Sequence, residues 1–508
     1  MSEAIGAPTP TRMTPPTALP SVAALTQIVT RAIAAWREPE AVAALTPARD
    51  RTPDDARLWL LLAATHRAAQ DTASALAAAR RAAALAPHDA LVAHTLARIA
   101  AEAGEPAVAL FDRALALAPR DAGVMLGRAA ALVAAGEGAA ASSFLADVLR
   151  QHPGWYDGHA TLARLRWQAG DRVTYAAGYA AALAAHPNDG LLWRDHAATV
   201  ARAGQGEAAR RIIAQARRAL GQSRTLDLIE AGTFSEDGEI AAADRLYRPH
   251  LPIADADALA GHVRHLLRAG RADAARAALD GRLGHGTPDL WPLAALAWRL
   301  TGDPRGDWLE RGGAFVRVFD LADAVAPIDD LAATLRALHR SVAAPLDQSL
   351  RGGTQTDGAL FARLDPAIVR LRDAVLAAVA RYLADLPAPD AAHPWLGLPR
   401  DRVRFAGSWS VRLTDRGHHV EHVHPAGWIS SACYVALPDG VADDPARGGW
   451  LSVGDAPSLI GTALPEWRQI APRAGKLVLF PSWAWHRTLP FTSGERLTVA
   501  FDIARPPL

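Results

Sequence analysis

The chain is most informative at residues 417–435, GHHVEHVHPAGWISSACYV, where four histidines within seven positions precede a run of strand-forming residues. His422 and His424 are two residues apart, so on a β-strand their side chains point to the same face. A third histidine, His486, follows 62 residues later in LVLFPSWAWHRTLPF, and Arg496 comes ten residues after it. If the strands close over one another, this spacing predicts an imidazole cluster with a guanidinium nearby.

The sequence around this cluster has the composition and segment lengths of an all-β domain. After Pro399 the segments are short, rich in Val, Leu, Trp, Thr and Phe, and bounded by Gly, Pro and Asp, which is typical of a sandwich, barrel or jelly roll. Upstream, residues 319–340 predict a strand and then a helix, and residues 344–356 predict a polar, glycine-containing loop. Helical periodicity over 364–386 predicts a helix, with Asp365 as its N-cap and Pro366 in its first turn.

The first half of the chain is a repeat array. Pro53, Pro87, Pro119, Pro153 and Pro187 are spaced by 34, 32, 34 and 34 residues. A second regular series, made of glycines, lies between the prolines at Gly104, Gly136, Gly170 and Gly204. Acidic or amide residues follow four of the prolines: Asp54, Asp89, Asp121 and Asn188. Each period therefore predicts a helix, a glycine turn, a second helix and a proline turn.

A unit of 34 residues with two helices resembles the tetratricopeptide repeat (TPR). The likeness is strong over residues 53–220 and weaker over 221–311, where AGRADAARAAL (269–279) still repeats the turn and second helix. We therefore predict a multidomain α + β protein. Its parts are a disordered tail (1–25), an α-solenoid of TPR-like helical hairpins (26–311) and a C-terminal double-stranded β-helix, or jelly roll, with flanking helices (312–508).

Composition narrows the classes of function. The 54 basic and 53 acidic side chains nearly balance, which argues against a nucleic-acid-binding protein. The single cysteine, Cys433, excludes an intramolecular disulfide and a cysteine-rich metal site, and its strand position predicts a buried, inert thiol. We find no signal peptide and no apolar run near the ~20 residues of a membrane span, so the expected compartment is the cytoplasm.

Three segments of the second half resemble a family of iron(II)- and 2-oxoglutarate-dependent oxygenases that often follow TPR arrays. They are HVHPAGWISSACYV, GKLVLFPSWAWH and ERLTVAFDI, and the loop QSLRGGTQT (348–356) is similar to a fourth. The resemblance implies Fe(II) held by His422, His424 and His486, and 2-oxoglutarate bound by Arg496. Thr498 shares the strand face of Arg496, and Arg351 in the loop is a further candidate for contact with the cosubstrate.

The pattern departs from the family at one position. The usual triad is two histidines and a carboxylate, but His424 stands at the carboxylate position, which leaves the metal one negative charge short. His419 and Glu421 offer a competing His-x-Glu pair on the opposite face of a regular strand. Arg496 has its own alternative, an ion pair with Glu495 or Asp502.

The resemblance implies a dioxygenase, expected to be a hydroxylase. Because a TPR array presents a concave surface suited to polypeptides, the expected substrate is a protein or peptide recruited by that surface, with a small molecule as the alternative. The competing hypothesis is a TPR scaffold carrying a catalytically silent, metal-binding jelly roll.

Overall fold

A computed structural model describes the chain except for residues 1–19, 347, 357, 456–457, 462–463 and 508. Most of the predicted N-terminal tail therefore lies outside the described residues. The first helix nevertheless begins at Val22, so the prediction that the tail extends to residue 25 was wrong at its end. Ser21 explains this start, because its side chain accepts a hydrogen bond from the Ala24 N–H as an N-cap.

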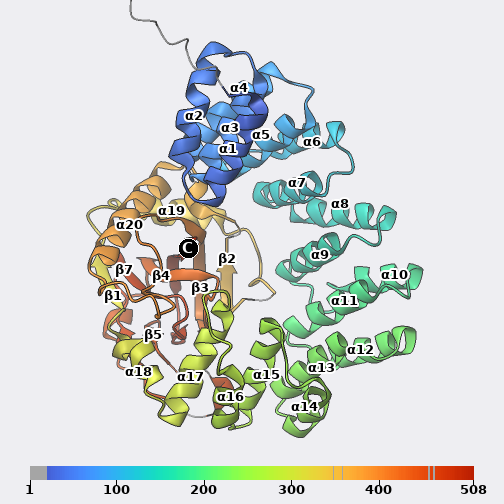
Figure 1. The fold of residues 1–508 in the computed structure, drawn as a ribbon, viewed down its shortest axis with the longest axis vertical. Helices are drawn as coiled ribbons and strands as arrows, with labels where there is room; N and C mark the ends of the chain where they lie inside the picture. Colours follow the sequence, from blue (N-terminus) through green and yellow to red (C-terminus); the bar gives the residue numbers. More distant parts are fainter. Residues whose placement is uncertain (1–19, 347, 357, 456–457, 462–463, 508) are drawn as a thin grey trace, which may run out of the picture.

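The N-terminal part is a solenoid of paired helices, as the repeat spacing predicts (Figure 1). Its helices are α1 Val22–Ala34, α2 Glu38–Arg51, α3 Ala56–Ala68, α4 Thr72–Leu85, α5 Ala90–Ala103, α6 Val108–Leu117, α7 Ala122–Ala135, α8 Gly138–Gln151, α9 Tyr156–Gln168, α10 Ala177–Ala185, α11 Gly190–Arg202, α12 Gly206–Leu220, α13 Arg224–Glu236, α14 Ile240–Tyr247, α15 Ala256–Arg268, α16 Ala272–Leu279, α17 Trp291–Thr301 and α18 Arg305–Glu310. No helix of the described chain is both long and apolar enough to cross a membrane.

Aspartates cap the first helix of several repeats. Asp89 and Asp121 accept backbone N–H hydrogen bonds at the starts of α5 and α7, as their position after a proline suggests. In two other turns the capping residues are Asp55 and Asp189, one position beyond Asp54 and Asn188. The cap lies two residues after the proline in all four turns. The helix therefore begins only after the proline turn is complete.

The C-terminal part is a curled antiparallel sheet flanked by two helices, α19 Ile328–Leu338 and α20 Pro366–Ala384. Its strands are β1 Arg317–Asp320, β2 Leu350–Gln355, β3 Phe405–His422, β4 Gly427–Ala436, β5 Leu451–Val453, β6 Arg468–Ile470, β7 Lys476–Pro481, β8 His486–Thr488 and β9 Glu495–Ala504. They follow the order β1-β7-β4-β9-β3-β8-β5-β6, with β2 beside β3. This is the predicted jelly roll.

The long strand β3 joins the two halves of the jelly roll. Its residues from Phe405 to Thr414 pair with β9, whereas His419 and His422 pair with β8. A register shift lies between His419 and His422. One strand therefore runs from the half containing β9 and β4 to the half containing β8 and β5, and it carries its histidines to the place where the halves meet.

The polar loop predicted over residues 344–356 was wrong in its second half, where β2 forms. This strand pairs with β3 even though it contains Gly352 and Gly353. A Cβ at Gly353 would lie 2.3 Å from the Arg412 carbonyl oxygen, so glycine is needed for the two backbones to approach. The close packing against β3 explains why glycines occur within a strand here.

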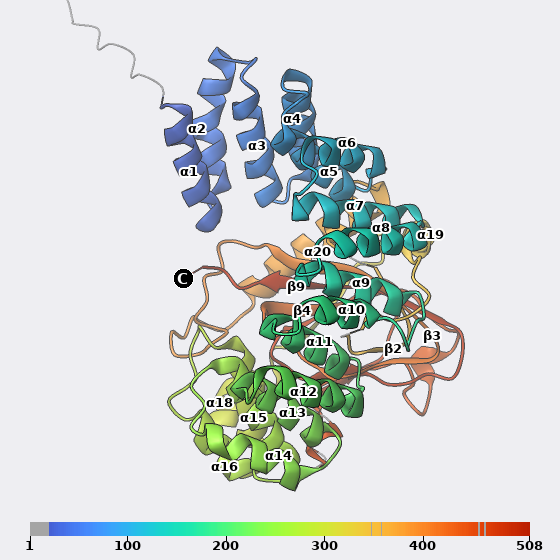
Figure 2. The ribbon, with the colours of Figure 1, turned by 90° about the vertical axis from the view of Figure 1, so that its right-hand side faces the viewer.

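The solenoid contacts the jelly roll along its length, and Figures 1 and 2 show it curving beside the sheet. At its N-terminal end the Gln70 side chain exchanges two hydrogen bonds with the Phe405 backbone, of 2.9 and 3.0 Å. Midway, Val342 and Ala343 donate to the Gln168 carbonyl. At its C-terminal end the Trp485 indole donates to the Pro292 carbonyl at 3.0 Å. These contacts fix the arch of helices relative to the sheet.

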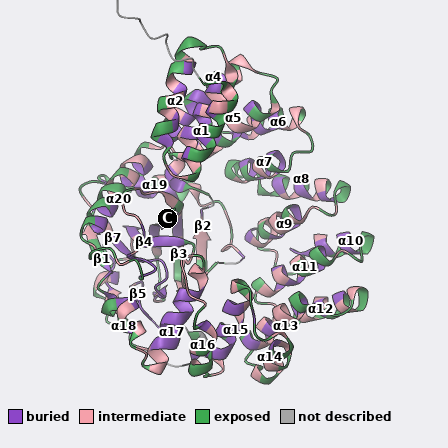
Figure 3. Ribbon diagram, viewed as in Figure 1, coloured by how far each residue is buried: buried purple, intermediate pink, exposed green. Residues whose placement is uncertain are grey.

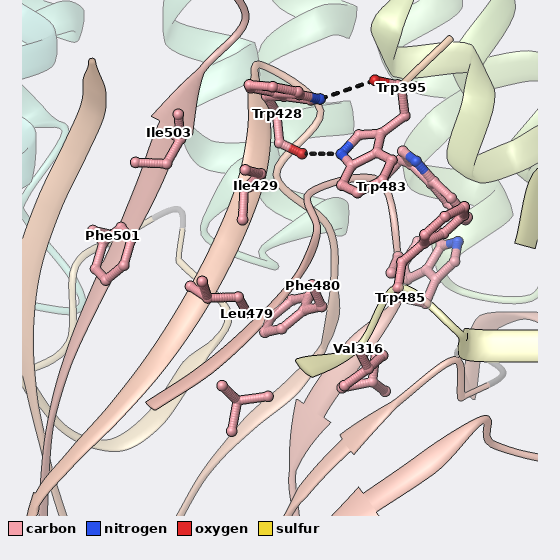
Figure 4. Close-up of a cluster of buried hydrophobic side chains, with 14 of the residues drawn as sticks. Val316, Trp395, Trp428, Ile429, Leu479, Phe480, Trp483, Trp485, Phe501 and Ile503 are labelled. Carbon is pink, nitrogen blue, oxygen red and sulfur yellow. Dashed lines mark hydrogen bonds between the residues drawn. The ribbon is translucent and has the colours of Figure 1, made fainter. Parts of the chain in front are cut away.

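A single apolar core runs from the last solenoid helices into the jelly roll, and Figure 3 shows its buried residues on α17 and β4. Trp395 and Trp428 are fully buried and hydrogen-bond reciprocally, each indole N–H donating to the backbone carbonyl of the other, at 2.7 and 3.1 Å (Figure 4). Cys433 is buried in this core, and burial raises the pKa of its thiol to about 12. The predicted boundary at 311/312 falls within this shared core and stays a prediction.

One buried histidine makes the junction of the two parts sensitive to acid. His393 is fully buried; its Nε2–H donates to the Leu309 carbonyl, and its Nδ1 accepts from the Trp395 and Leu396 N–H groups. Burial lowers the pKa of His393 to about 4. Between pH ~6.5 and ~4 the unfolded chain therefore takes up a proton that the folded protein does not.

We accordingly expect the free energy of unfolding to fall as the pH decreases across this window, with His393 contributing at most about 1.4 kcal/mol per pH unit. Denaturant unfolding at pH 7 and pH 5 measures this. A His393→Asn variant should be less stable at pH 7 but should show a smaller further loss at pH 5. An identical loss in the variant and the wild type would contradict this role for His393.

Candidate metal centre

Three histidines meet where β3 and β8 pair. His422 ends β3 and lies opposite His486, the first residue of β8. His424 follows just beyond β3, where its N–H donates to the Ser482 carbonyl at 2.9 Å. One ring nitrogen from each histidine lies within 4.8 Å of the others. The structure thus brings together the three residues that the sequence singled out as metal ligands.

The outer ring nitrogen of each histidine already has an oxygen partner. Nδ1 lies 2.8 Å from the Val420 carbonyl in His422, 3.0 Å from the Ala484 carbonyl in His486 and 2.7 Å from the Asp502 carboxylate in His424. An oxygen acceptor requires Nδ1 to carry the hydrogen, so in the neutral form of each of the three rings the free lone pair is on Nε2. Three free lone pairs held this way are what a metal ion requires.

Burial keeps two of the three rings neutral. It lowers the pKa of His422 to about 3 and that of His486 well below its ordinary value, and the neighbouring histidines lower both further. His424 differs: burial would lower its pKa too, but the Asp502 carboxylate outweighs this effect and raises it. The free imidazoles of His422 and His486 are therefore unprotonated at neutral pH and can bind a metal.

The Asp502 carboxylate lies behind the three histidines, where it is hydrogen-bonded to His424. It lies on β9, where Arg496, Thr498 and Asp502 occupy alternate positions and so share one face of the strand. Its Oδ2 accepts from His424, and its Oδ1 accepts from the Ser430 hydroxyl at 2.6 Å. A carboxylate hydrogen-bonded to a ligating histidine increases the basicity of that ligand. Asp502 therefore brings a negative charge close to the position where the usual carboxylate ligand is missing.

This arrangement predicts that Asp502 tunes metal affinity. We expect Asp502→Asn to weaken Fe(II) binding by about 10- to 100-fold, the usual cost of losing an outer-shell partner. Anaerobic competition with a chromophoric chelator measures it. Glu495→Gln is the matched control. Glu495 lies on the same strand as Asp502, but its carboxylate pairs with Arg336 and Arg412. Equal affinities in Asp502→Asn and wild type would show that the outer carboxylate has no such role.

Arg496 is buried without an anionic partner. Only 2% of it is exposed, its Nε donates to the Gly449 carbonyl at 3.1 Å, and its guanidinium carbon lies 5.0 Å from the centre of the Tyr434 ring. Within the described residues no carboxylate forms an ion pair with it, because Glu495 pairs with two other arginines and Asp502 with His424. The buried Tyr434 hydroxyl also has no hydrogen-bond partner there.

A buried guanidinium is costly unless an anion pairs with it. Arg496 and the Tyr434 hydroxyl therefore fit a carboxylate ligand, and the guanidinium offers bidentate geometry for one. Thr498 lies two residues along β9 from Arg496, is buried, and is paired with Tyr434 of β4. Tyr434 was not predicted from the sequence.

The structure does not bring the competing pair together. The Glu421 carboxylate lies 3.4 Å from Arg487 and 3.2 Å from the Ser458 hydroxyl. His419 instead lies beside His422, with ring centres 5.5 Å apart, and its Nδ1 is 2.9 Å from the Ser349 hydroxyl. The prediction that 419 faces away from 422 assumed a regular strand, and the register shift in β3 removes that alternation.

Arg351 and Trp409 make contacts of a different kind from those of the candidate metal ligands and Arg496. Arg351 donates to the backbone carbonyls of Gln348 and Leu350 and lines a cavity facing the solenoid, so this geometry gives no support to its predicted contact with the cosubstrate. Trp409 is half-buried and stacks on His424 with ring centres 5.7 Å apart and planes 15° apart. It orients the ring of a candidate ligand.

Two family models match parts of the chain. Residues 407–502 match the family described as "Putative 2OG-Fe(II) oxygenase", and residues 99–165 match a tetratricopeptide repeat model. The chain therefore combines a TPR region with a C-terminal 2OG-Fe(II) oxygenase domain. That family implies Fe(II) and 2-oxoglutarate as cofactors, and the cluster of His422, His424 and His486 is suited to bind the iron.

Solved structures similar to parts of the chain include both classes. A prolyl-4-hydroxylase of Pseudomonas putida is 21% identical, with 39% of this chain and 96% of that chain covered and a TM-score of 0.27. A thermophilic TPR protein of Thermus thermophilus is 22% identical, with 35% and 97% covered and a TM-score of 0.27. The pilus biogenesis factor PilW is 16% identical, with 46% and 95% covered and a TM-score of 0.27. None of the curated proteins matches the chain.

Proposed function

We propose that this protein is an Fe(II)- and 2-oxoglutarate-dependent hydroxylase that acts on a protein or peptide recruited by its TPR solenoid. The observation that carries the proposal is the set of three imidazoles with free Nε2 atoms in the same domain as a buried, unpaired arginine. His422, His424 and His486 would hold the iron, and Arg496, with Thr498 and Tyr434 beside it, would hold the far carboxylate of 2-oxoglutarate.

The bound iron and 2-oxoglutarate would supply the oxidising power for C–H hydroxylation. The residues of this chain orient the participants and exclude competing partners. The backbone carbonyls at Val420 and Ala484 fix two imidazole rings, and Asp502 fixes the third. Burial of Arg496 keeps water and other anions from pairing with it, which leaves its charge for the cosubstrate.

Two features support a polypeptide as substrate. The solenoid is fixed beside the jelly roll by contacts at both its ends and at its middle, so a chain bound along its helices is held near the histidine cluster. A solenoid also offers the extended surface that polypeptides require. A small molecule would need neither feature.

Consumption of 2-oxoglutarate tests the proposal. Purified protein loaded anaerobically with Fe(II) and then exposed to O₂ should convert 2-oxoglutarate to succinate, slowly without substrate and faster with it. Omission of iron should abolish the reaction. Iron-loaded protein that produces no succinate, with or without a library of peptides, would favour the alternative of a TPR scaffold with a catalytically silent jelly roll.

A further inference from the structure

A cavity of about 830 Å³ lies between the solenoid and the segment that leads into β2. One wall comes from the α9–α15 part of the solenoid. The other comes from residues 342–346 and 350–353. This volume lies within the ~300–1,000 Å³ of ordinary ligand sites. Figure 1 shows β2 facing the arch of helices across this region.

The side chains that line the cavity carry mostly positive charge. Among the described residues, its lining includes five arginines and one carboxylate, that of Glu236. The arginines are Arg172, Arg202, Arg264, Arg268 and Arg351. The whole chain is nearly neutral, with a formal net charge of +1, so this concentration of guanidinium groups is local. A cavity of one sign attracts ligands of the opposite sign.

Two of these arginines repel each other. Arg264 and Arg268 are one turn apart on α15, where like charges destabilise a helix. The Glu236 carboxylate forms an ion pair with Arg268, at 3.9 Å, and lies near enough to Arg264 for the two charges to attract, but Arg264 forms no ion pair within the described residues. An anionic ligand in the cavity would relieve this repulsion, which gives the ligand a direct source of binding energy.

The part of the opposite wall formed by residues 342–346 is apolar and held in place. Val342 and Ala343 donate hydrogen bonds to the Gln168 carbonyl of the solenoid, at 3.2 and 3.1 Å. Leu346 is buried in a cluster that includes Trp193 and Tyr179 of the solenoid. The ligand would therefore meet arginines on the helical side, and apolar side chains together with Arg351 on the other, a combination that suits an acidic polypeptide better than a simple anion.

The same segment connects the cavity to the histidine cluster. Leu350 and Arg351 line the cavity and pair in β2 with His419 and His418 of β3. The preceding residue, Ser349, lies 2.9 Å from the ring of His419, which in turn lies beside His422. A chain bound in the cavity is thus separated from the candidate metal centre by a single strand.

The aromatic residues of the cavity disfavour a nucleic acid. Single-stranded nucleic acids bind to such surfaces by stacking bases on free aromatic faces. The two large aromatic side chains of the lining are both in use, because Arg172 lies 3.8 Å over Trp167 and Tyr247 packs against His262 and His265. Arginine-rich walls without a free stacking surface favour carboxylate side chains on a polypeptide.

We propose that this cavity binds an acidic, extended segment of the polypeptide substrate and holds the chain beside the metal centre. This inference rests on the proposed hydroxylase function and names the class of its substrate. Arg264 and Arg268 recognise Asp or Glu side chains of the segment, Arg202 and Arg351 extend the cationic surface, and the apolar wall receives the side chains between them.

Fluorescence anisotropy with full-length protein tests the proposal. The probe is a fluorescein-labelled decapeptide of alternating Glu and Ala, compared with the Gln–Ala peptide and with a ten-nucleotide oligo-dT. We expect the Glu–Ala peptide to bind at least about tenfold tighter than the Gln–Ala peptide, as expected for charge-assisted hydrogen bonds. Its affinity should fall as salt is raised.

The double variant Arg264→Gln/Arg268→Gln should weaken binding of the Glu–Ala peptide by about tenfold or more. The matched control Arg150→Gln/Arg211→Gln removes two exposed arginines outside the cavity and should bind like wild type. Circular dichroism establishes that each variant is folded, and Arg202→Gln provides a second cavity variant. Equal affinity for the Glu and Gln peptides, unchanged affinity in the cavity variants, or tighter binding of oligo-dT would overturn the inference.

Succinate production by the same wild-type protein separates this inference from the proposed function. Production of succinate without preference for the acidic peptide would overturn the cavity assignment alone. Arginine-dependent binding of the acidic peptide without succinate production would contradict the hydroxylase function and leave the cavity as an acidic-peptide site.

Discussion

Replacing His486 with alanine is expected to abolish tight Fe(II) binding. His486 supplies one of the three free Nε2 atoms and is buried, with 6% exposure, so neither water nor a surface side chain can take its place without rearrangement. Losing an outer-shell partner costs about 10- to 100-fold in metal affinity, and losing a ligand should exceed that range. Chelator competition under anaerobic conditions measures the affinity, and consumption of 2-oxoglutarate should disappear with it.

His418→Ala is the control for this experiment. His418 belongs to the same histidine-rich segment, but its Nδ1 contacts the Arg416 carbonyl and its ring is not part of the cluster. It should bind Fe(II) like wild type. Because the His486 ring packs against Phe480, thermal unfolding of both variants is needed to show that lost binding does not reflect lost structure. A folded His486→Ala protein with wild-type affinity would refute the ligand assignment.

Replacing Arg496 with glutamine should remove 2-oxoglutarate binding and leave Fe(II) binding intact. Truncating one partner of a buried, hydrogen-bonded charge pair costs about 2–5 kcal/mol, or roughly thirtyfold to several thousandfold in affinity. Arg496 fits this case, because it is 2% exposed and has no carboxylate partner within the described chain. Isothermal titration of the Fe(II)-loaded protein with 2-oxoglutarate under anaerobic conditions measures the loss.

Arg412→Gln is the matched control for Arg496. Arg412 lies on the neighbouring strand β3 but is paired with Glu495, so its loss should not affect the cosubstrate. Both variants replace an arginine with glutamine. They differ in whether the lost arginine has a carboxylate partner in the protein. Wild-type affinity for 2-oxoglutarate in Arg496→Gln, or an equal loss in Arg412→Gln, would show that Arg496 does not hold the cosubstrate.

The periodic parts of the fold were predictable from the sequence. The regular spacing of prolines and glycines indicated the helix pairs, and the short apolar segments after Pro399 indicated that this part of the chain forms the strands of a jelly roll. The strand β2 was missed because its local sequence, with two adjacent glycines, has low strand propensity, and pairing with β3 overrides that preference. Asp365 is the N-cap residue of α20, as predicted, but its side chain accepts a hydrogen bond from Arg363 instead of a helix N–H.

The site was predictable where strand alternation applies and unpredictable where it fails. The spacing of His422 and His424 and the later His486 correctly indicated three side chains that meet. The position of His419 could not be predicted, because a register shift in β3 is not visible in the sequence. The sequence predicts Asp502 only as an alternative partner of Arg496. Its six-residue spacing from Arg496 placed it on the same strand face, but its contact with His424 depends on how β9 meets the end of β3.

An anaerobic titration of the Fe(II)-loaded protein with 2-oxoglutarate tests the central claim most directly. A bidentate keto acid on iron(II) gives a visible metal-to-ligand charge-transfer band. We predict a saturable band that is present in the wild type, lost in His486→Ala because the iron is lost, and lost in Arg496→Gln although the iron remains bound. Absence of the band in wild-type protein that demonstrably holds Fe(II) would contradict the account and leave the three histidines as a metal site without 2-oxoglutarate chemistry.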